Sequence, residues 1–306
     1  MTTVTDTAGH SKTNTNTNTS NNTSTDTPQI LVIGATGKTG RRVVSQLREK
    51  GLNVREGSRH SSPAFDWHNR DTWQPALTGI RSVYITYFPD LAMPQAPADI
   101  NDFCELATAA GVEHLVLLSG RGEPEAQHCE TIVQQSGLDW TLVRASWFNQ
   151  NFSEGAFIDM ILGGMIALPV NETGEPFIDA NDIAEVVVAA LTDARHRNQL
   201  YEVTGPELLS FAQLAQIFTR EADIPVQFQS ISLETFHQQL TQDGMPDSMI
   251  AMLEYLFTEV LDGRNAYTTD GVERALGRAA RSFADYVRAA AHNGAWEQTA
   301  DRATAD

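Results

Sequence analysis

The sequence predicts an α/β fold with a parallel, doubly wound sheet and a smaller second α/β region towards the C-terminus. Two observations lead to this fold class. Short apolar runs alternate with stretches of helical periodicity from Gln29 to Arg144, and the first run leads directly into a glycine-rich turn and a helix pattern. Strands and helices that alternate in this way pack as a parallel sheet covered on both faces. Ligands bind at the carboxyl ends of such strands, so the residues that follow each strand are the candidates for a site.

The first element is the strand Ile30–Ile33, which ends in a glycine-rich turn. Glycines at positions 34, 37 and 40 let the backbone approach a bound pyrophosphate, and the helix pattern of residues 41–50 presents free N–H groups to the anion. The flanking strand and helix favour this interpretation over an ordinary turn. The predicted cradle consists of Gly34, Thr36, Gly37, Lys38, Thr39 and Gly40.

The second strand, Leu52–Gly57, is followed by Arg59 among serines. A site that prefers NAD(H) usually has a carboxylate here for the ribose hydroxyls, whereas a guanidinium pairs well with a 2′-phosphate. Arg59 therefore favours NADP(H) over NAD(H). Glu56 is the alternative, because a strand that ended one or two residues earlier would let its carboxylate face the ribose. A solvated loop arginine is the plain alternative for Arg59.

The rest of the predicted sheet follows in regular alternation. Gly111 and Gly137 each end a helix pattern, and Ser119 and Gly120 end the fifth strand. The further predicted strands are residues 65–67, 80–88, 113–118 and 139–144, and the helices are residues 97–110 and 123–136.

The second half of the chain continues with helix patterns and one strand. Asp182 is a plausible N-cap for the helix of residues 183–191, and Ser210 precedes the helix of residues 211–221. The other predicted elements are the strand of residues 200–203 and the helices of residues 233–240, 247–261 and 282–291.

Composition excludes several classes of function. Lys and Arg number 21 and Asp and Glu number 39, so the net charge is −18. Such a surface repels nucleic-acid phosphate and argues against direct nucleic-acid binding. The chain has no run of about 18 apolar residues, so no membrane span is predicted. Cys104 and Cys129 form no disulfide or metal framework, which favours a reducing cytoplasm, and the histidines lack paired-ligand spacing, so no metal site is predicted.

Two terminal stretches lie outside the predicted fold. Residues 1–28 are rich in Thr, Asn and Ser and have almost no apolar residues. Such a segment buries too little surface to offset its chain entropy, so we predict that it is disordered. It also lacks the apolar centre of a signal peptide. Residues 293–306 are predicted to be a polar tail.

Several motifs together resemble one family. The resemblance is carried by residues 34–40, 57–59, 65–67, 115–119, 147–154, 176–184 and 205–210. Over about residues 29–290 the chain resembles the NmrA-like branch of the atypical short-chain dehydrogenase/reductases. The Asn-Phe-Ser-Glu run of residues 151–154 and the Asp-Gly-Met-Pro run of residues 243–246 are similar to those of the fungal ergot-alkaloid reductases of the festuclavine or agroclavine dehydrogenase type. The resemblance implies a Rossmann domain at residues 29–150, a mainly substrate-binding domain at residues 151–292, and NADPH in the cleft.

The resemblance also assigns roles to single residues. It implies that Asp66 contacts the adenine with Trp67 beside it, and that Tyr87 lies by the nicotinamide ring with Phe88 next to the substrate. The loop after the sixth strand is expected to close the pocket. Its substrate-binding candidates are Trp147, Phe148, Asn151 and Phe152. The alternatives are a turn or cap for Asp66 and core packing for the aromatic side chains.

The helix after the fifth strand lacks the Tyr-x-x-x-Lys pair that most of the wider superfamily uses to protonate its product. Residues 123–133 contain no tyrosine, and no lysine follows Lys50. An iminium ion remains a compatible substrate, because it accepts hydride directly. The candidates for a substitute acid are Tyr87, Ser119, which is also expected to contact the cofactor, and His128. The alternative for Tyr87 is aromatic packing, and for Ser119 it is a local hydrogen bond to the backbone. The alternative for His128 is an exposed position on the helix surface.

Two functions are compatible with the absence of the Tyr-x-x-x-Lys pair. The first is an NADPH-dependent reductase of an imine, an iminium or an activated double bond in a small molecule. The second is a non-enzymatic NADP(H)-sensing regulator that acts through protein partners. The run from Trp147 to Glu154 and the similarity to the alkaloid reductases favour the enzyme. A monomer or a homodimer is expected.

Overall fold

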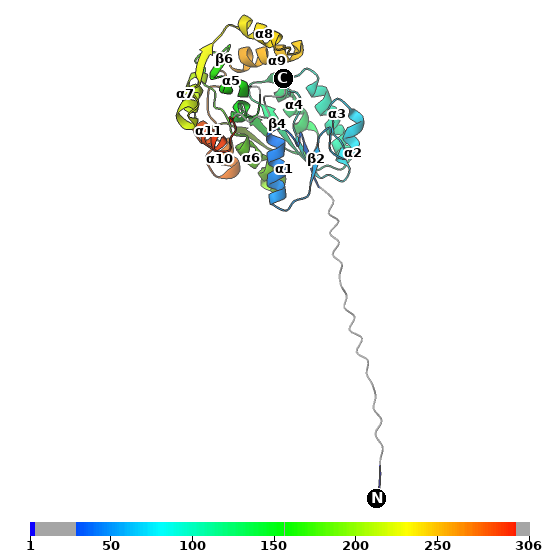
Figure 1. Ribbon diagram of the computed structural model, residues 1–306. Coiled ribbons are helices and arrows are strands. Elements are labelled where there is room, and N and C mark those ends of the chain that lie inside the picture. The colour runs from blue at the N-terminus through cyan, green and yellow to red at the C-terminus, as the bar shows by residue number, and fades with distance from the viewer. Residues whose placement is uncertain (4–28, 156, 298–306) are drawn as a thin grey trace.

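The computed structural model describes residues 1–3, 29–155 and 157–297, and its centre is a six-stranded parallel sheet (Figure 1). The strand order is β2-β1-β3-β4-β5-β7, and every neighbouring pair is parallel. The strands are β1 Ile30–Ile33, β2 Val54–Gly57, β3 Ser82–Ile85, β4 His114–Gly120, β5 Asp139–Ala145 and β7 Gln199–Val203. The chain winds outward in both directions from β1 and β3, which confirms the predicted fold class.

Helices cover both faces of this sheet. One face packs against α1 (Lys38–Glu49), α6 (Ala180–Thr192) and α10 (Gly271–Leu276). The other face packs against α2 (Trp73–Leu77), α3 (Ala96–Ala109) and α4 (Pro124–Gln135). The interior residues of the strands are almost fully buried because both faces are covered, and the apolar runs of the sequence reflect this burial.

A second, smaller region packs around its own apolar core and includes the parallel strand pair β6 and β8. Its elements are α5 Ile158–Leu162, β6 Met165–Leu168, α7 Phe211–Ala222, β8 Gln227–Ser230, α8 Leu233–Gln242, α9 Asp247–Tyr255, the π-helix Leu256–Val260 and α11 Phe283–His292. Figure 1 shows α8 and α9 at the top of the molecule. Short 3₁₀ segments lie at Arg70–Thr72, Asn149–Phe152 and Ala194–His196.

The predicted third strand, residues 65–67, is not part of the sheet. Asp66 forms only an isolated bridge with Asn69. The Asp66 carbonyl instead accepts a hydrogen bond of 2.8 Å from the Trp73 indole, and the Trp67 indole donates to the Thr86 carbonyl at 2.9 Å. These side-chain bonds and a buried cluster of aromatic rings hold the segment in place of strand pairing.

The predicted cap of helix α6 is also different in the structure. Asp179, and not Asp182, caps the helix by accepting a hydrogen bond of 2.7 Å from the Asn181 backbone N–H. The helix therefore begins at Ala180. Asp182 is fully buried in the first turn and pairs with two arginines of a later segment.

Part of the predicted C-terminal tail is packed against the second region. Trp296 is buried, and its indole donates a hydrogen bond of 2.8 Å to the Phe152 carbonyl. The packed chain therefore extends beyond the predicted boundary at residue 292. The predicted disorder of residues 1–28 falls mainly on residues 4–28, which lie outside the described residues, as do residues 298–306.

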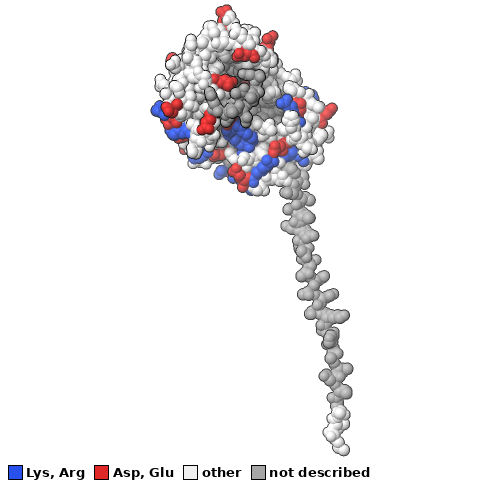
Figure 2. All heavy atoms as spheres, in the orientation of Figure 1, with Lys and Arg blue, Asp and Glu red and all other residues white. Residues whose placement is uncertain are grey.

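Two findings concern membrane-spanning helices and groups of metal-binding side chains. In the part of the chain that the structure describes, no helix is long and apolar enough to cross a membrane. Within the same residues, no group of three or more His, Cys, Asp or Glu side chains could hold a metal ion. On the face drawn in Figure 2, acidic and basic side chains are interspersed.

Candidate functional site

A groove of about 590 Å³ lies at the carboxyl ends of the neighbouring strands β1 and β3, from which the strand order runs outward in both directions. This is the position at which doubly wound sheets bind ligands. The groove brings together most of the residues that the sequence analysis assigned to the cofactor. They are Gly34, Thr36, Gly37, Lys38, Thr39, Arg59, Asp66, Trp67 and Tyr87. Phe88, predicted to lie next to the substrate, lines this groove and not the second pocket.

The three glycines of the turn have different steric roles. Gly34 has a φ of +69°, and a Cβ atom there would lie 2.1 Å from Thr86 Oγ1. A Cβ atom on Gly40 would lie 2.1 Å from the Gly34 carbonyl oxygen, so this glycine lets α1 pack against the turn. A Cβ atom on Gly37 would meet only that carbonyl, at 3.2 Å, and would otherwise face the groove. Gly37 therefore provides the space that a pyrophosphate needs.

The N-terminus of α1 faces the same space. The helix begins at Lys38 directly after Gly37, and no side chain caps its first turn. Its first N–H groups are therefore available to an anion, and the helix dipole favours negative charge at this end. The residues present fit the pyrophosphate of a dinucleotide cofactor.

Arg59 and Glu56 occupy different surroundings. Glu56 pairs with Arg48 of α1, with 2.6 Å between Oε1 and Nη2, and does not line the groove. Arg59 lines the groove, and its guanidinium has no partner among the described residues. The Ser61 hydroxyl holds the intervening loop by accepting from the Ser58 N–H at 3.0 Å and donating to the Ser58 carbonyl at 2.8 Å. Of the two alternatives, Arg59 is the residue in position to contact a cofactor.

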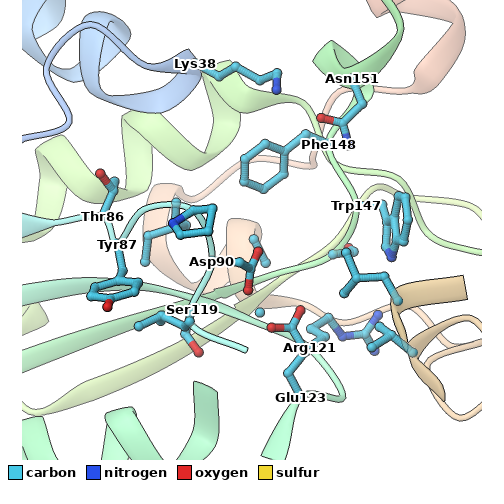
Figure 3. Close-up of a pocket in the computed structure, with 18 of the residues that line it drawn as sticks. Lys38, Thr86, Tyr87, Asp90, Ser119, Arg121, Glu123, Trp147, Phe148 and Asn151 are labelled. Carbon is cyan, nitrogen blue, oxygen red and sulfur yellow. The ribbon is translucent and has the colours of Figure 1, made fainter. Parts of the chain in front are cut away.

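A second pocket, of about 310 Å³, continues from the groove (Figure 3). Lys38, Tyr87 and Phe148 line both spaces. Leu118, Trp147 and Leu256 contribute apolar walls. Its polar residues include Asp90, Asn151, Ser119, Arg121, Glu123 and Glu175. The second space is thus large enough for a small molecule and adjoins the groove.

Two carboxyl groups in this pocket face each other, those of Asp90 and Glu123 (Figure 3). Two carboxyl groups this close favour a state in which one of them carries a proton that it can donate to the other. Burial, and secondly the charge of Asp90, raise the pKa of Glu123 to about 9. Burial also raises the pKa of Asp90. Gly120 makes room for the pair, since a Cβ atom there would lie 2.2 Å from Glu123 Oε1.

Two further polar groups in the pocket lack partners. Glu175 and Ser119 are only 2% and 4% exposed, and neither Glu175 Oε1 nor Ser119 Oγ has a hydrogen-bond partner among the described residues. Burial raises the pKa of Glu175 to about 7, although the Arg121 charge opposes this shift. Arg121 itself is paired with Glu202 at 2.8 Å.

Comparison with known proteins identifies the family. The NmrA-like family model matches residues 126–288, and a model described as NAD(P)H-binding matches residues 34–194. The chain belongs to the NmrA-like family. It also belongs to the NAD(P)H-binding family, whose model covers the β1 turn and most of the other residues that line the groove.

The similarity of this NmrA-like protein to two named relatives covers nearly all of each relative's length. The NAD(P)H azoreductase of Xenophilus azovorans is 33% identical over 85% of this chain and 97% of the relative. The festuclavine dehydrogenase of Aspergillus fumigatus is 30% identical over 84% of this chain and 96% of the relative. The predicted similarity to the alkaloid reductases is confirmed, and the azoreductase shows a comparable similarity.

A solved structure shows the same fold as this NmrA-like chain. The triphenylmethane reductase of Citrobacter sp., complexed with NADP(H), has a TM-score of 0.69 and 19% identity. The match covers 85% of this chain and 99% of that chain. It therefore spans the sheet and the second region together.

Not every predicted site residue of the NmrA-like chain lies in the two cavities. Trp147, Phe148 and Asn151 line the second pocket. Phe152 is fully buried in the core of the second region, and His128 is exposed on α4; neither lines the groove or the pocket.

Tyr87 lies where the two spaces meet, but its hydroxyl is already engaged. It donates a hydrogen bond of 2.7 Å to Asp99 Oδ2. Burial raises the pKa of Tyr87, and the bond to Asp99 raises it further. The aromatic ring packs on Trp67 with 4.9 Å between ring centroids. This NmrA-like protein therefore holds Tyr87 as a wall of the site, with its proton committed to Asp99.

Sequence reasoning missed Asp90, Glu123 and Glu175. Asp90 follows β3 and Glu123 follows β4, so both obey the rule that strand ends carry the site. That rule is the signal that could have found them. For Glu175, which lies in an irregular segment, the NmrA-like sequence offers no comparable signal.

Proposed function

We propose that this protein is an NADPH-dependent reductase of a small molecule that carries an imine, an iminium or an activated double bond. The observation that carries the proposal is the continuous cavity, in which a groove shaped for a dinucleotide joins a pocket with apolar walls and polar groups. Relatives named as a reductase and a dehydrogenase support an enzyme. Free buried Cys104 and Cys129 fit a reducing cytoplasm.

The chain's own residues perform three tasks in this reaction. The glycine turn and α1 hold the pyrophosphate, Tyr87 and Phe148 line the junction of groove and pocket, and the apolar walls limit the access of water. When bound, the reduced nicotinamide supplies a hydride. Positioning of the acceptor beside that hydride accounts for much of the catalysis.

The cofactor preference rests on Arg59. Replacing Arg59 by alanine is expected to weaken NADPH binding by roughly 1.5–3 kcal/mol, the range for a hydrogen bond to a charged group, and to leave NADH binding nearly unchanged. Fluorescence titration of the pure protein with both cofactors measures this difference. Arg48→Ala is the matched control, because Arg48 pairs with Glu56 outside the groove. Equal or tighter NADH binding by the unaltered protein would refute the Arg59 argument.

The substrate class is tested with a panel of cyclic imines, N-alkyl iminium ions, enones and ketones, assayed for NADPH oxidation. An iminium is expected to be reduced faster than its matched ketone, because it needs no proton and the Tyr-x-x-x-Lys pair is missing. A faster ketone would contradict this order. Tight NADPH binding with no turnover of any substrate would favour the alternative function, an NADP(H)-sensing regulator.

Tyr87 provides a further prediction. Tyr87→Phe is expected to lower kcat by less than about tenfold, well short of the roughly 10²–10⁴-fold loss for a true general acid. The reason is that the Tyr87 hydroxyl donates to Asp99 and its pKa is raised. Steady-state kinetics on the iminium and on the enone measure the loss. Abolished turnover would make Tyr87 the acid.

A further inference from the structure

Two separate strand ends bring Asp90 and Glu123 together. Asp90 lies in the segment between β3 and α3, and Glu123 occupies the N-cap position of α4, just after β4. Their carboxyl groups point towards each other in the second pocket (Figure 3). Glu123 is 7% exposed and Asp90 is half-buried, so the pair is largely shielded from water.

We propose that Glu123 is the proton donor of the reduction and that Asp90 keeps the proton on Glu123 until a substrate is bound. The inference rests on the proposed reductase function and names the group that replaces the missing Tyr-x-x-x-Lys pair. The pair holds one proton between two carboxyl groups, so Glu123 can give that proton to a neighbouring atom while Asp90 stays ionised.

Two unpartnered polar atoms indicate that the pocket takes a polar ligand. Ser119 Oγ and Glu175 Oε1 line the same space and have no partner among the described residues, although both side chains are more than nine-tenths buried. Buried polar atoms are rarely left unpaired. A substrate with a nitrogen or oxygen atom near the Asp90–Glu123 pair would satisfy them.

The step balances in atoms and charge. The cofactor supplies two electrons and one hydrogen as hydride, and the new bond forms at the electrophilic carbon of a C=C or C=N group. The π electrons of that group move to its other atom, which takes the proton as the O–H bond of Glu123 breaks. Glu123 is left as a carboxylate beside Asp90, and it recovers a proton from solvent because two adjacent carboxylates repel each other. An N-alkyl iminium needs the hydride alone.

The surroundings keep Glu123 protonated at neutral pH. Burial is the first cause, followed by the charge of Asp90 and, more weakly, the charge of Glu125 on the same helix. The other charged or titratable groups near the pair are Arg121, whose guanidinium is paired with Glu202, and Glu175, Lys38 and Tyr255. A proton donor must be protonated before the reaction, so the rate is expected to fall as the pH rises through about 9.

The test compares an enone, which needs a proton, with an N-alkyl iminium, which does not, under saturating NADPH. Glu123→Gln keeps a hydrogen-bond donor for Asp90, so the fold is expected to persist. Its kcat is expected to drop roughly 10²–10⁴-fold on the enone and less than about tenfold on the iminium. The matched control is Glu273→Gln, which makes the same change at an exposed position of α10, outside the pocket. It should retain kcat on both substrates.

Two further measurements distinguish proton donation by Glu123 from a purely structural role of this residue. Asp90→Asn removes the negative neighbour, so the alkaline limb of the enone pH profile should shift to lower pH. Infrared spectroscopy without substrate should show a protonated carboxylic acid at pH 8 that is absent from Glu123→Gln. Equal losses on both substrates in Glu123→Gln, or no infrared difference, would overturn the inference. If the unaltered protein binds NADPH but reduces neither the enone nor the iminium, the proposed function itself is refuted.

Discussion

Replacing Gly37 by valine is expected to abolish NADPH binding while the protein stays folded. A Cβ atom at Gly37 would meet only the Gly34 carbonyl, at 3.2 Å, so the turn itself needs to give by only a few tenths of an ångström. The remaining carbons of valine would project into the groove, where the pyrophosphate must approach the backbone closely. Fluorescence titration should then detect no binding, and the melting temperature should change little.

Gly40→Ala provides the contrast. A Cβ atom at Gly40 would lie 2.1 Å from the Gly34 carbonyl oxygen, which is backbone and cannot move aside cheaply. This variant should lose stability as well as cofactor affinity. If Gly37→Val instead bound NADPH with unchanged affinity, the cofactor would not cross this turn and the assignment of the groove would fail.

Replacing Asp182 by alanine is expected to lower the free energy of unfolding by about 3 kcal/mol, the lower end of the range for breaking a buried ion pair. Asp182 is fully buried and accepts hydrogen bonds of 2.7 Å from the Arg278 guanidinium and from the Arg281 backbone N–H. The lower end applies because both guanidiniums are about one third exposed, at 35% and 37%. Urea denaturation measures the change.

The control for this prediction is Glu113→Ala. Glu113 pairs with Arg81 on the surface, where side chains are 45% and 57% exposed, and such pairs contribute at most about 1 kcal/mol. Equal losses in the two variants would show that Asp182 contributes no more than a surface charge and that other contacts hold the segment at residues 278–281 to α6.

The cofactor half of the site could be predicted because it is encoded by neighbouring residues. Strand β1, the three glycines and helix α1 are contiguous, so period and composition reveal them together. Arg59 follows β2 by two positions, and the same rule about strand ends locates it. The family match confirms the NAD(P)H cofactor, and the assignment of these residues to its site stays a prediction.

The substrate half could not be predicted in the same way. Asp90 and Glu123 belong to different strand-end loops, and only the pairing of β3 with β4 makes them neighbours. Sequence also does not show burial, which is what turns two ordinary carboxyl groups into a pair that shares a proton. Sequence also does not show ring packing. The apolar residues Phe65 and Trp67 predicted a strand, but the tertiary packing of their rings determines the conformation of this segment.

The Asp90–Glu123 pair also affects how folding responds to pH. In the unfolded chain, Glu123 would lose its proton near the ordinary carboxyl pKa of 4.5, whereas the folded chain retains it up to about 9. Folding therefore takes up protons across this interval, and the folded state becomes progressively less favoured as the pH rises through it. Glu175 acts in the same direction between 4.5 and about 7. These two carboxyl groups thus lower the stability of the folded state at neutral pH, and a ligand that forms hydrogen bonds with them would stabilise the whole chain.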